Sequence, residues 1–328
     1  MQTIPDHSFC IAPMMDWTDR HERYFLRLLT TRALLYTEML TSAALVRGDA
    51  SHLLKHNIEE YPLGLQLGGS DPLELAVAAR LAEDRGFAEI NLNIGCPSDR
   101  VQSGRFGACL MSEPQLVAEC VASIHNAIRL PVTLKCRIGI DAMDSDEELA
   151  RFVETVASAG CENFIIHARI AILNGLSPKE NRSIPPLNYQ RVFAMKKRFP
   201  ELQIILNGGI TNIEEGRQWL DQVDGIMVGR EAYQNPFILH LVDSLFFNEP
   251  KRQQSRIDIL QAYLPYVRRE LEAGTPLHHM TRHVLGLFRG VRGGKYFRRH
   301  ISENSHNSDA SINVLLDGMK FVSQGSFV

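Results

Sequence analysis

Apolar residues in the first 230 positions recur in short, nearly continuous runs, each followed by a turn and an amphipathic stretch. Such runs of Ile, Leu and Val are typical of parallel strands that are covered on both faces. The eight predicted strands are Phe9–Pro13, Leu34–Thr37, Leu63–Leu67, Glu89–Asn93, Val132–Arg137, Asn163–His167, Gln203–Asn207 and Gly225–Val228.

Helix start and stop signals lie between these runs, in the form of acidic or hydroxyl caps, prolines in first turns and glycines after last turns. The predicted helices run from Asp71 to about Arg85, from Ser112 to about Arg129 and from Asp144 to Gly160. Eight strands that alternate with helices over about 230 residues indicate a (β/α)8 TIM barrel. A doubly wound sheet is the alternative. Its dinucleotide-binding form requires Gly-x-Gly-x-x-Gly after an early strand, and the sequence contains no such run.

The pattern changes after Pro236, where the strand signal ends. Three helices are predicted beyond this point, over Ile257–Glu272, Thr281–Val291 and Ala310–Phe321. The run Asn248-Glu249-Pro250 is typical of a linker, so we predict a barrel over residues 1–245 and a small all-helical domain over residues 246–328. The tail from Ser323 to Val328 is expected to fray.

Composition is that of a globular protein, with 45% hydrophobic and 22% charged residues in a chain of 328. The apolar runs are too short to span a bilayer, and the start of the chain lacks the basic and apolar segments of a signal peptide. We therefore expect a cytoplasmic protein that has no membrane association. Nothing in the sequence calls for an obligate protein partner.

Charge is unevenly distributed along the chain. The segment from Lys251 to Val328 contains 12 Lys and Arg against 6 Asp and Glu, whereas the first 250 residues carry a net charge of −9. Most of the positive charge lies between Arg268 and Arg299. A basic C-terminal part on an acidic body favours a polyanionic partner, although a solvated helical surface would give the same pattern.

Polar residues follow the predicted strands at their carboxyl ends, where the active site of such a barrel lies. They are Gln66, Asn91, Asn93, Cys96, Lys135, Arg137, His167, Asn207 and Arg230. Taken singly, Gln66 could be a capping amide, Lys135 a surface charge and His167 a buried histidine. Their shared position on one rim favours a functional site.

Glycines mark the loops after the last two predicted strands, as Gly208-Gly209 and Gly229-Arg230. Barrels of this type commonly bind phosphate at these two loops. Glycine allows backbone N–H groups to approach a phosphate, and Arg230 would add a charge-assisted bond. A tight turn at Gly208-Gly209 is the structural alternative.

Six cysteines are present, and none belongs to a Cys-x-x-Cys pair, so we expect no metal site. Cys96 differs from the others because it lies between Gly95 and Pro97, on a loop at a strand end. A thiol at this place indicates a nucleophile or a proton donor.

Several motifs together resemble the tRNA-dihydrouridine synthases. They are Ala12-Pro13-Met14, Asn91-Leu92-Asn93-Ile94-Gly95-Cys96-Pro97, Gly104-Arg105-Phe106-Gly107-Ala108-Cys109-Leu110-Met111, Asn207-Gly208-Gly209-Ile210 and Gly229-Arg230. Two further runs resemble the A-type branch of this family, Ser177-Pro178-Lys179-Glu180-Asn181-Arg182 and Ile184-Pro185-Pro186-Leu187. The resemblance covers nearly the whole chain.

The resemblance implies FMN on a (β/α)8 barrel and a helical tRNA-binding domain. NADPH would reduce the flavin, N5 of the reduced flavin would pass a hydride to C6 of uracil, and Cys96 would protonate C5. The positions that match FMN-binding residues are Ala12, Pro13, Met14, Gln66, Lys135, His167, Asn207, Gly208, Gly209, Gly229 and Arg230. Asn93 matches a position that touches the substrate nucleotide. Lys179, Arg182, Lys295 and Arg298 match positions that orient tRNA, and the branch acts on uridines 20 and 20a of the D-loop.

Two other classes share part of this pattern. A barrel flavoenzyme for a small molecule, such as a dihydroorotate dehydrogenase relative, would have the glycine loops and the lysine without the basic C-terminal part. A non-catalytic RNA-binding barrel would not need an intact rim. Steep salt dependence of tRNA binding would separate the first from a tRNA enzyme, and bound flavin would exclude the second.

Overall fold

The computed structural model describes residues 5–323, so residues 324–328 of the expected frayed tail lie outside the described part. Nine parallel strands form one sheet in the described residues. The strands are β1 (Phe9–Ile11), β2 (Leu35–Tyr36), β3 (Leu40–Thr41), β4 (Leu63–Gly68), β5 (Glu89–Ile94), β6 (Val132–Arg137), β7 (Asn163–His167), β8 (Gln203–Asn207) and β9 (Gly225–Val228). Eight of them match the predicted strands, and β3 is a short addition that pairs with β4.

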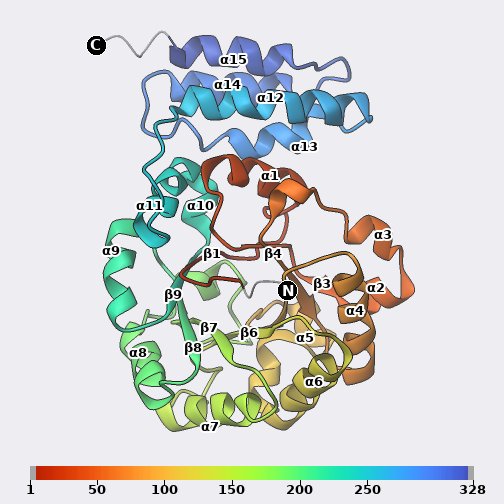
Figure 1. Ribbon diagram of the computed structural model, residues 1–328, viewed down its shortest axis with the longest axis vertical. Helices are drawn as coiled ribbons and strands as arrows, with labels where there is room; N and C mark the ends of the chain where they lie inside the picture. Colours follow the sequence, from red (N-terminus) through yellow and green to blue (C-terminus); the bar gives the residue numbers. More distant parts are fainter. Residues whose placement is uncertain (1–4, 324–328) are drawn as a thin grey trace. The chain divides into compact units, whose positions relative to one another are not determined.

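The sheet curves into a nearly closed barrel (Figure 1). Its strand order is β1-β9-β8-β7-β6-β5-β4-β2. The two ends of this order meet through a parallel bridge between Cys10 and Leu34, supported by a 3.0 Å hydrogen bond from Leu34 N to Phe9 O. The predicted (β/α)8 barrel is therefore confirmed.

Helices lie on the outside of the barrel, between successive strands. They are α2 (Ser42–Arg47), α3 (Ala50–Leu53), α4 (Pro72–Asp84), α5 (Asp99–Ser103), α6 (Pro114–Ala127), α7 (Asp146–Ala157), α8 (Tyr189–Arg198) and α9 (Ile213–Gln218). The three predicted helices correspond to α4, α6 and α7. Asp71 caps α4 by accepting from Glu74 N at 2.9 Å, and Pro72 occupies its first turn.

The barrel interior has an apolar part and a polar part. Side chains alternate between the two faces of a strand, so every second residue faces inward. The apolar part is formed by Cys10, Ala12, Leu34, Tyr36, Ile165, Ile205 and Met227, with Met14 against it. On β4, β5 and β6 the buried residues include Gln66, Asn91, Asn93 and Thr133, which are linked by hydrogen bonds. These polar residues interrupt the nearly continuous apolar character that was predicted for the strands.

A second compact unit consists, among the described residues, of residues 16–32 and 230–323. Its helices are α1 (Arg20–Leu29), α10 (Arg230–Gln234), α11 (Val242–Phe246), α12 (Arg256–Glu272), α13 (Leu277–Thr281), α14 (Gly294–Asn304) and α15 (Asn313–Ser323). The assignment of residues 1–245 and 246–328 to separate roles stays a prediction.

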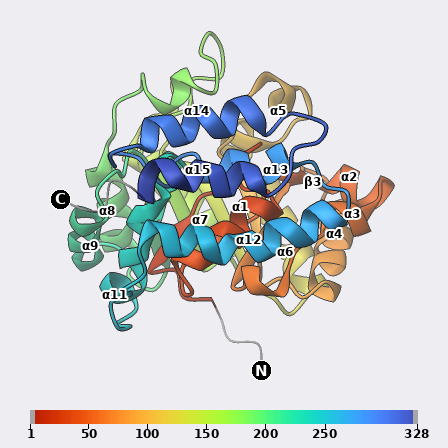
Figure 2. The same cartoon turned by 90° about the horizontal axis from the view of Figure 1, so that it is seen from above.

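The predicted single helix over Thr281–Val291 is wrong. In the structure α13 ends at Thr281, a short 3-10 turn follows, and α14 begins only at Gly294. Gly290 and Gly293 have φ of +76° and +83°, a left-handed conformation that stops a helix. In this unit α14 and α15 lie side by side (Figure 2), and Phe297 of α14 packs edge-on against Phe288 at 4.7 Å between ring centroids.

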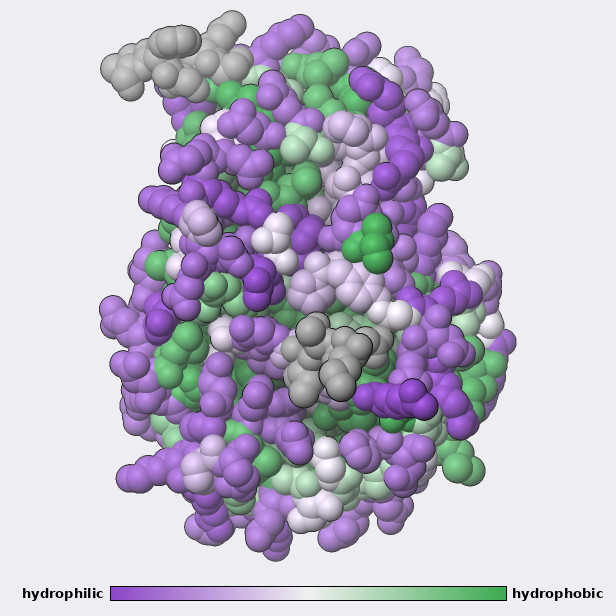
Figure 3. Space-filling view, viewed as in Figure 1, coloured by the Kyte–Doolittle hydropathy of each residue, from purple (hydrophilic) through white to green (hydrophobic). Residues whose placement is uncertain are grey.

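Hydrophilic side chains predominate on the face drawn in Figure 3, with apolar residues scattered among them. Among residues 5–323, no helix combines the length and the apolar composition that crossing a membrane would require.

The buried Asp243 carboxylate joins the two segments of the second unit. It accepts hydrogen bonds from the hydroxyls of Thr30 and Thr31 and from the backbone N–H groups of Thr31 and Arg32. Burial by itself raises the pKa of Asp243, but these hydrogen bonds outweigh it and hold the pKa below its ordinary value. The resulting stabilisation is present above the ordinary carboxyl pKa of 3.8 and is lost as the pH falls through the lowered pKa.

We expect Asp243→Asn to lower the free energy of unfolding by about 3 kcal/mol, because an amide replaces an oxygen that accepts from several donors. Asp317→Asn is the control, since Asp317 forms an exposed pair with Lys320 and should change stability by less than about 0.5 kcal/mol. Urea denaturation at pH 7 measures both values. Equal losses in the two variants would contradict the role of Asp243.

Candidate active site

Asn93, near the end of β5, organises the loop that carries Cys96. Its Oδ1 accepts hydrogen bonds from the backbone N–H groups of Gly95 and Cys96, each at 3.0 Å. Its Nδ2 donates to Oε1 of Gln66 on β4 at 2.8 Å. Gln66 and Asn93, which were both predicted for the rim, are therefore in contact. Asn93 also fixes the backbone of Cys96, a third residue predicted for the rim.

The Cys96 thiol is half-buried, and its Sγ donates to Ser98 Oγ at 3.5 Å. The other half-buried cysteine, Cys109, lies in the 3-10 turn Gly107–Ser112 and donates to Phe106 O at 3.2 Å. The remaining cysteines, Cys10, Cys120, Cys136 and Cys161, are buried. Cys96 is thus the cysteine that follows a barrel strand directly on a loop.

Lys135 on β6 pairs in register with Asn93, so the Lys135 side chain begins beside the strand end that leads into the Cys96 loop. Burial, followed by the charge of the nearby Arg137, lowers the pKa of Lys135 to about 8, although the Cys136 and Cys96 side chains act in the opposite direction. A cation and a thiol therefore influence each other at this point of the rim.

Arg137 has a role that the sequence did not assign. It is buried, its Nε donates to Gly95 O at 3.1 Å, and its terminal nitrogen donates to Ile170 O at 3.1 Å and Asn181 O at 3.0 Å. The guanidinium thus joins the Cys96 loop to the loop after β7. Its position two residues after Lys135, on the same side of the strand, was the available signal.

Asn181, which is fully buried, holds the long loop after β7. Its side chain accepts from Ile172 N and donates to Ile172 O, both at 2.8 Å. Lys179 and Arg182 flank it at the start and end of one 3-10 turn, and both are exposed. Residues three apart in a 3-10 turn lie on the same side, so the two cations share one surface.

The ends of β7 and β8 bring His167, Asn207 and the first glycine loop together. His167 pairs in register with Asn207, whose Nδ2 donates to Met227 O at 2.8 Å. Gly208 and Gly209 have φ of +118° and +67°, which L side chains rarely adopt. A Cβ at Gly208 would lie 2.6 Å from His167 Cδ2, so this approach of backbone to ring requires glycine.

The second glycine loop meets the start of the chain. A Cβ on Gly229 would lie 3.6 Å from Ala12 Cβ and 3.7 Å from Met14 Sδ, with Pro13 between these two residues in the chain. Arg230, the next residue, begins α10 in the second unit.

Lys295 and Arg298 also belong to the second unit, where both lie on α14. Residues three apart on an α-helix face the same way, so these two side chains share one side of α14. Their cooperation with Lys179 and Arg182 stays a prediction.

The rim of the barrel unit therefore gathers a thiol, a lysine, amides, a histidine and two glycine loops. These residues fit a flavin, since the glycine backbones admit a phosphate and Lys135 supplies a cation for an electron-rich ring. Fold and rim together define a barrel enzyme whose reacting groups come from the ends of several strands.

The family model described as Dihydrouridine synthase (Dus) matches residues 10–323. The chain belongs to the dihydrouridine synthase family, whose members reduce uridines in tRNA. This membership supports a flavin cofactor.

Relatives named tRNA-dihydrouridine(20/20a) synthase are similar over nearly their full length. The protein of Shewanella oneidensis is 55% identical over 310 residues, which cover 94% of this chain and 92% of that protein. The protein of Escherichia coli (strain K12) is 55% identical over 315 residues, or 96% of this chain and 91% of that protein.

A solved complex of 2-naphthoyl-CoA reductase with 2-naphthoyl-CoA has a similar fold, with a TM-score of 0.56 at 12% identity. The match covers 73% of this chain and 51% of that chain, and it bears on the fold alone.

We expect Gly208→Ala to lower flavin retention severalfold, because the methyl group would displace His167 and narrow the glycine loop. Gly175→Ala is the matched control: Gly175 also has a positive φ, of +91°, but nothing lies within 4 Å of a Cβ there. The flavin-to-protein absorbance ratio after purification measures retention. Equal losses in both variants would mean that backbone strain, rather than the contact with His167, is responsible.

Proposed function

We propose that the chain is a tRNA-dihydrouridine(20/20a) synthase, which uses FMN and NADPH to reduce the C5–C6 bond of uridines 20 and 20a in the D-loop of tRNA. The observation that carries the proposal is the 55% identity, over more than nine-tenths of both chains, to proteins with this name. A tRNA substrate would place the protein in the cytoplasm. Mapping of dihydrouridine in tRNA from a strain with and without the gene tests the proposal. Unchanged uridines at both positions would refute it.

The cofactor would lie against the rim of the barrel. The residues proposed to hold FMN are Ala12, Pro13, Met14, Gln66, Lys135, His167, Asn207, Gly208, Gly209, Gly229 and Arg230. A bound, reduced flavin supplies the hydride that C6 of the uracil receives. The glycine loops bring backbone N–H groups to the phosphate, and Arg230 adds a charge there.

Cys96 is the proton donor in this proposal. Hydride addition at C6 leaves negative charge on C5 and O4 of the base, and an acid positioned over C5 neutralises it. Asn93 holds the backbone of Cys96, so the thiol has a defined place. The charges of Lys135 and Arg137 lie close enough to the Cys96 side chain to interact with it.

Lys135 contributes as a cation. Its pKa is lowered to about 8, chiefly by burial, so the ammonium form predominates at neutral pH and is lost as the pH rises through that value. A positive charge at this place stabilises negative charge that develops on a flavin ring.

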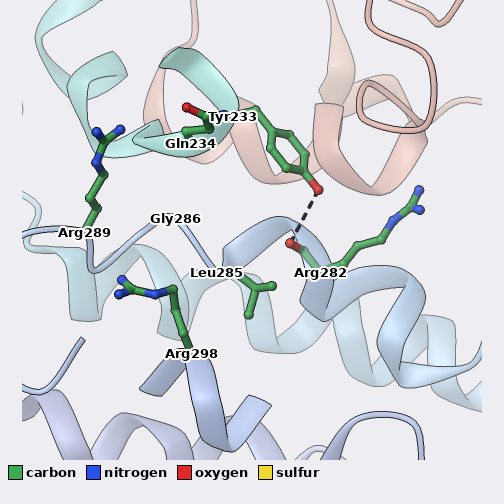
Figure 4. Close-up of a pocket in the computed structure, with 7 residues that line it drawn as sticks. All are labelled: Tyr233, Gln234, Arg282, Leu285, Gly286, Arg289 and Arg298. Carbon is green, nitrogen blue, oxygen red and sulfur yellow. Dashed lines mark hydrogen bonds between the residues drawn. The ribbon is translucent and has the colours of Figure 1, made fainter. Parts of the chain in front are cut away.

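The tRNA would be held by basic residues of both units. Arg298 lines a cavity of about 450 Å³ in the second unit, together with Tyr233, Gln234, Arg282, Leu285, Gly286 and Arg289. Figure 4 shows the guanidinium groups of Arg289 and Arg298 on the same side of this cavity. Arg289 pairs with Glu231 and Arg282 with Asp19, which leaves Arg298 the best placed of the three for a phosphate.

We expect Cys96→Ala to slow the reoxidation of reduced flavin by unmodified tRNA about 10²–10⁴-fold, the usual contribution of a general acid. Flavin content, reduction by NADPH and tRNA binding should be unchanged. Single-turnover reoxidation without oxygen is the measurement, and Cys109→Ala is the control. A wild-type rate in Cys96→Ala would end the proton-donor assignment, and a loss in Cys109→Ala alone would move it there.

We expect simultaneous replacement of Lys179, Arg182, Lys295 and Arg298 by alanine to weaken tRNA binding by at least tenfold and to reduce its salt dependence, because phosphate contacts are lost. NADPH oxidation by the free flavoenzyme should be unaffected. Filter binding at several salt concentrations measures both quantities. An unchanged affinity and salt slope would show that these charges are only solvated surface.

A further inference from the structure

A chain of buried hydrogen bonds crosses the barrel interior from the first residue of β5 to the Cys96 loop. Glu89 Oε1 accepts from Thr133 Oγ1 at 2.9 Å, and Thr133 Oγ1 accepts from Asn91 Nδ2 at 2.9 Å. Asn91 Oδ1 accepts from Gln66 Nε2 at 2.8 Å, and Gln66 Oε1 accepts from Asn93 Nδ2 at 2.8 Å. The chain ends where Asn93 Oδ1 accepts from the N–H groups of Gly95 and Cys96. We call it the Glu89 ladder.

Strand register brings these side chains together. Glu89, Asn91 and Asn93 alternate along β5 and so point to the same side of the strand. Asn91 pairs in register with Gln66 of β4 and with Thr133 of β6. Each member of the ladder is at most 9% exposed, so water cannot readily replace a missing partner.

The Glu89 carboxylate fixes the direction of the ladder because it can only accept. Besides Thr133, it takes a hydrogen bond from Tyr36 Oη at 2.7 Å and contacts His7 Nε2 at 2.7 Å. The Thr133 hydroxyl therefore donates its proton to Glu89, and its oxygen can accept a hydrogen bond only from the NH₂ group of Asn91. Each following amide must then turn its NH₂ toward Glu89 and its oxygen toward the rim.

The carboxylate of Glu89 affects the titratable groups beside it. Burial alone lowers the pKa of His7, but the charge of Glu89 and the hydrogen bond to it reverse this effect, so the pKa of His7 is raised. Burial, followed by the charge of Glu89, raises the pKa of Tyr36, which stays a hydrogen-bond donor. Gly64 leaves room for this group, since a Cβ there would lie 2.8 Å from the Tyr36 ring and 3.0 Å from Glu89 Cγ.

Reversal of the amides would disrupt the rim. If Asn93 presented its NH₂ to the loop, it would face the N–H groups of Gly95 and Cys96, and donors would oppose donors in a buried place. The oxygen of Asn93 is thus held toward the loop by a charge that lies several hydrogen bonds away.

We propose that Glu89 is a positioning residue, which acts through Thr133, Asn91 and Gln66 to orient Asn93 and thereby to hold the loop of the Cys96 thiol. Its importance for catalysis rests on the proposed function, whereas its effect on the loop does not.

The test compares two variants with Thr133→Ser, which keeps the hydroxyl. Thr133→Val breaks the ladder near its base, and Glu89→Gln replaces one oxygen with an NH₂ donor, so that the base of the ladder no longer only accepts. Tyr36→Phe is the control, because it removes a hydrogen bond to the same Glu89 oxygen from a donor outside the ladder. Hydrogen exchange of the Gly95 and Cys96 amides in the full chain is the first readout. Reoxidation of reduced flavin by tRNA is the second, and thermal denaturation reports stability.

We expect exchange at Gly95 and Cys96 to rise about tenfold in Thr133→Val and Glu89→Gln, the effect of roughly one hydrogen bond, and reoxidation to slow by a similar factor. Thr133→Ser should restore both values, and Tyr36→Phe should lower the melting temperature without changing either. If Glu89→Gln does not fold, the comparison of Thr133→Val with Thr133→Ser tests the proposal by itself.

Wild-type exchange at the loop in Thr133→Val would overturn the proposal, as would equal acceleration in Tyr36→Phe. A wild-type enzyme that fails to reduce uridine in tRNA would refute the proposed function instead, while the exchange measurement would still report on the ladder.

Discussion

The two hydrogen bonds that Asn93 Oδ1 accepts from Gly95 and Cys96 connect the barrel interior to the loop on which the chemistry is proposed to occur. Arg137 holds the same loop from the other side, through Gly95 O. Between these contacts the thiol is kept at the rim by groups that are buried and have few alternative partners. A positioned acid needs such support, because a misplaced proton donor contributes little.

The division of the barrel interior explains how this support arises. The apolar part fills its share of the interior with side chains such as Leu34, Ile165 and Met227. The polar part on β4, β5 and β6 places amides and a hydroxyl where a simple barrel would have branched apolar residues. Buried polar groups of this kind are tolerated because each finds a partner, and a complete network gives every amide one orientation.

Much of this protein was accessible from its sequence. The eight main strands, α4, α6, α7 and α12, and the distinction of Cys96 from the other cysteines followed from apolar runs, capping signals and glycine positions. The helix predicted over Thr281–Val291 failed because the α-helical path ends at Thr281, and Gly290 and Gly293 adopt left-handed conformations that the sequence pattern does not predict. The roles of Arg137 and Asn181 could not be predicted. Arg137 donates to backbone carbonyls 33 to 44 positions away, and the side chain of Asn181 bonds to a residue 9 positions away. No local sequence pattern predicts such pairs.

The sequence by itself determined the period of the elements, the order of strands and the residue types at each strand end, since these depend on neighbours along the chain. It also determined the family, through motifs that span nearly the whole length. Only the tertiary structure decided which side chains meet. Register between parallel strands sets Asn91 beside both Gln66 and Thr133, and one residue of slippage would turn each of these side chains to the other face. The orientation of Asn93, and with it the place of the Cys96 loop, is therefore a property of the closed barrel.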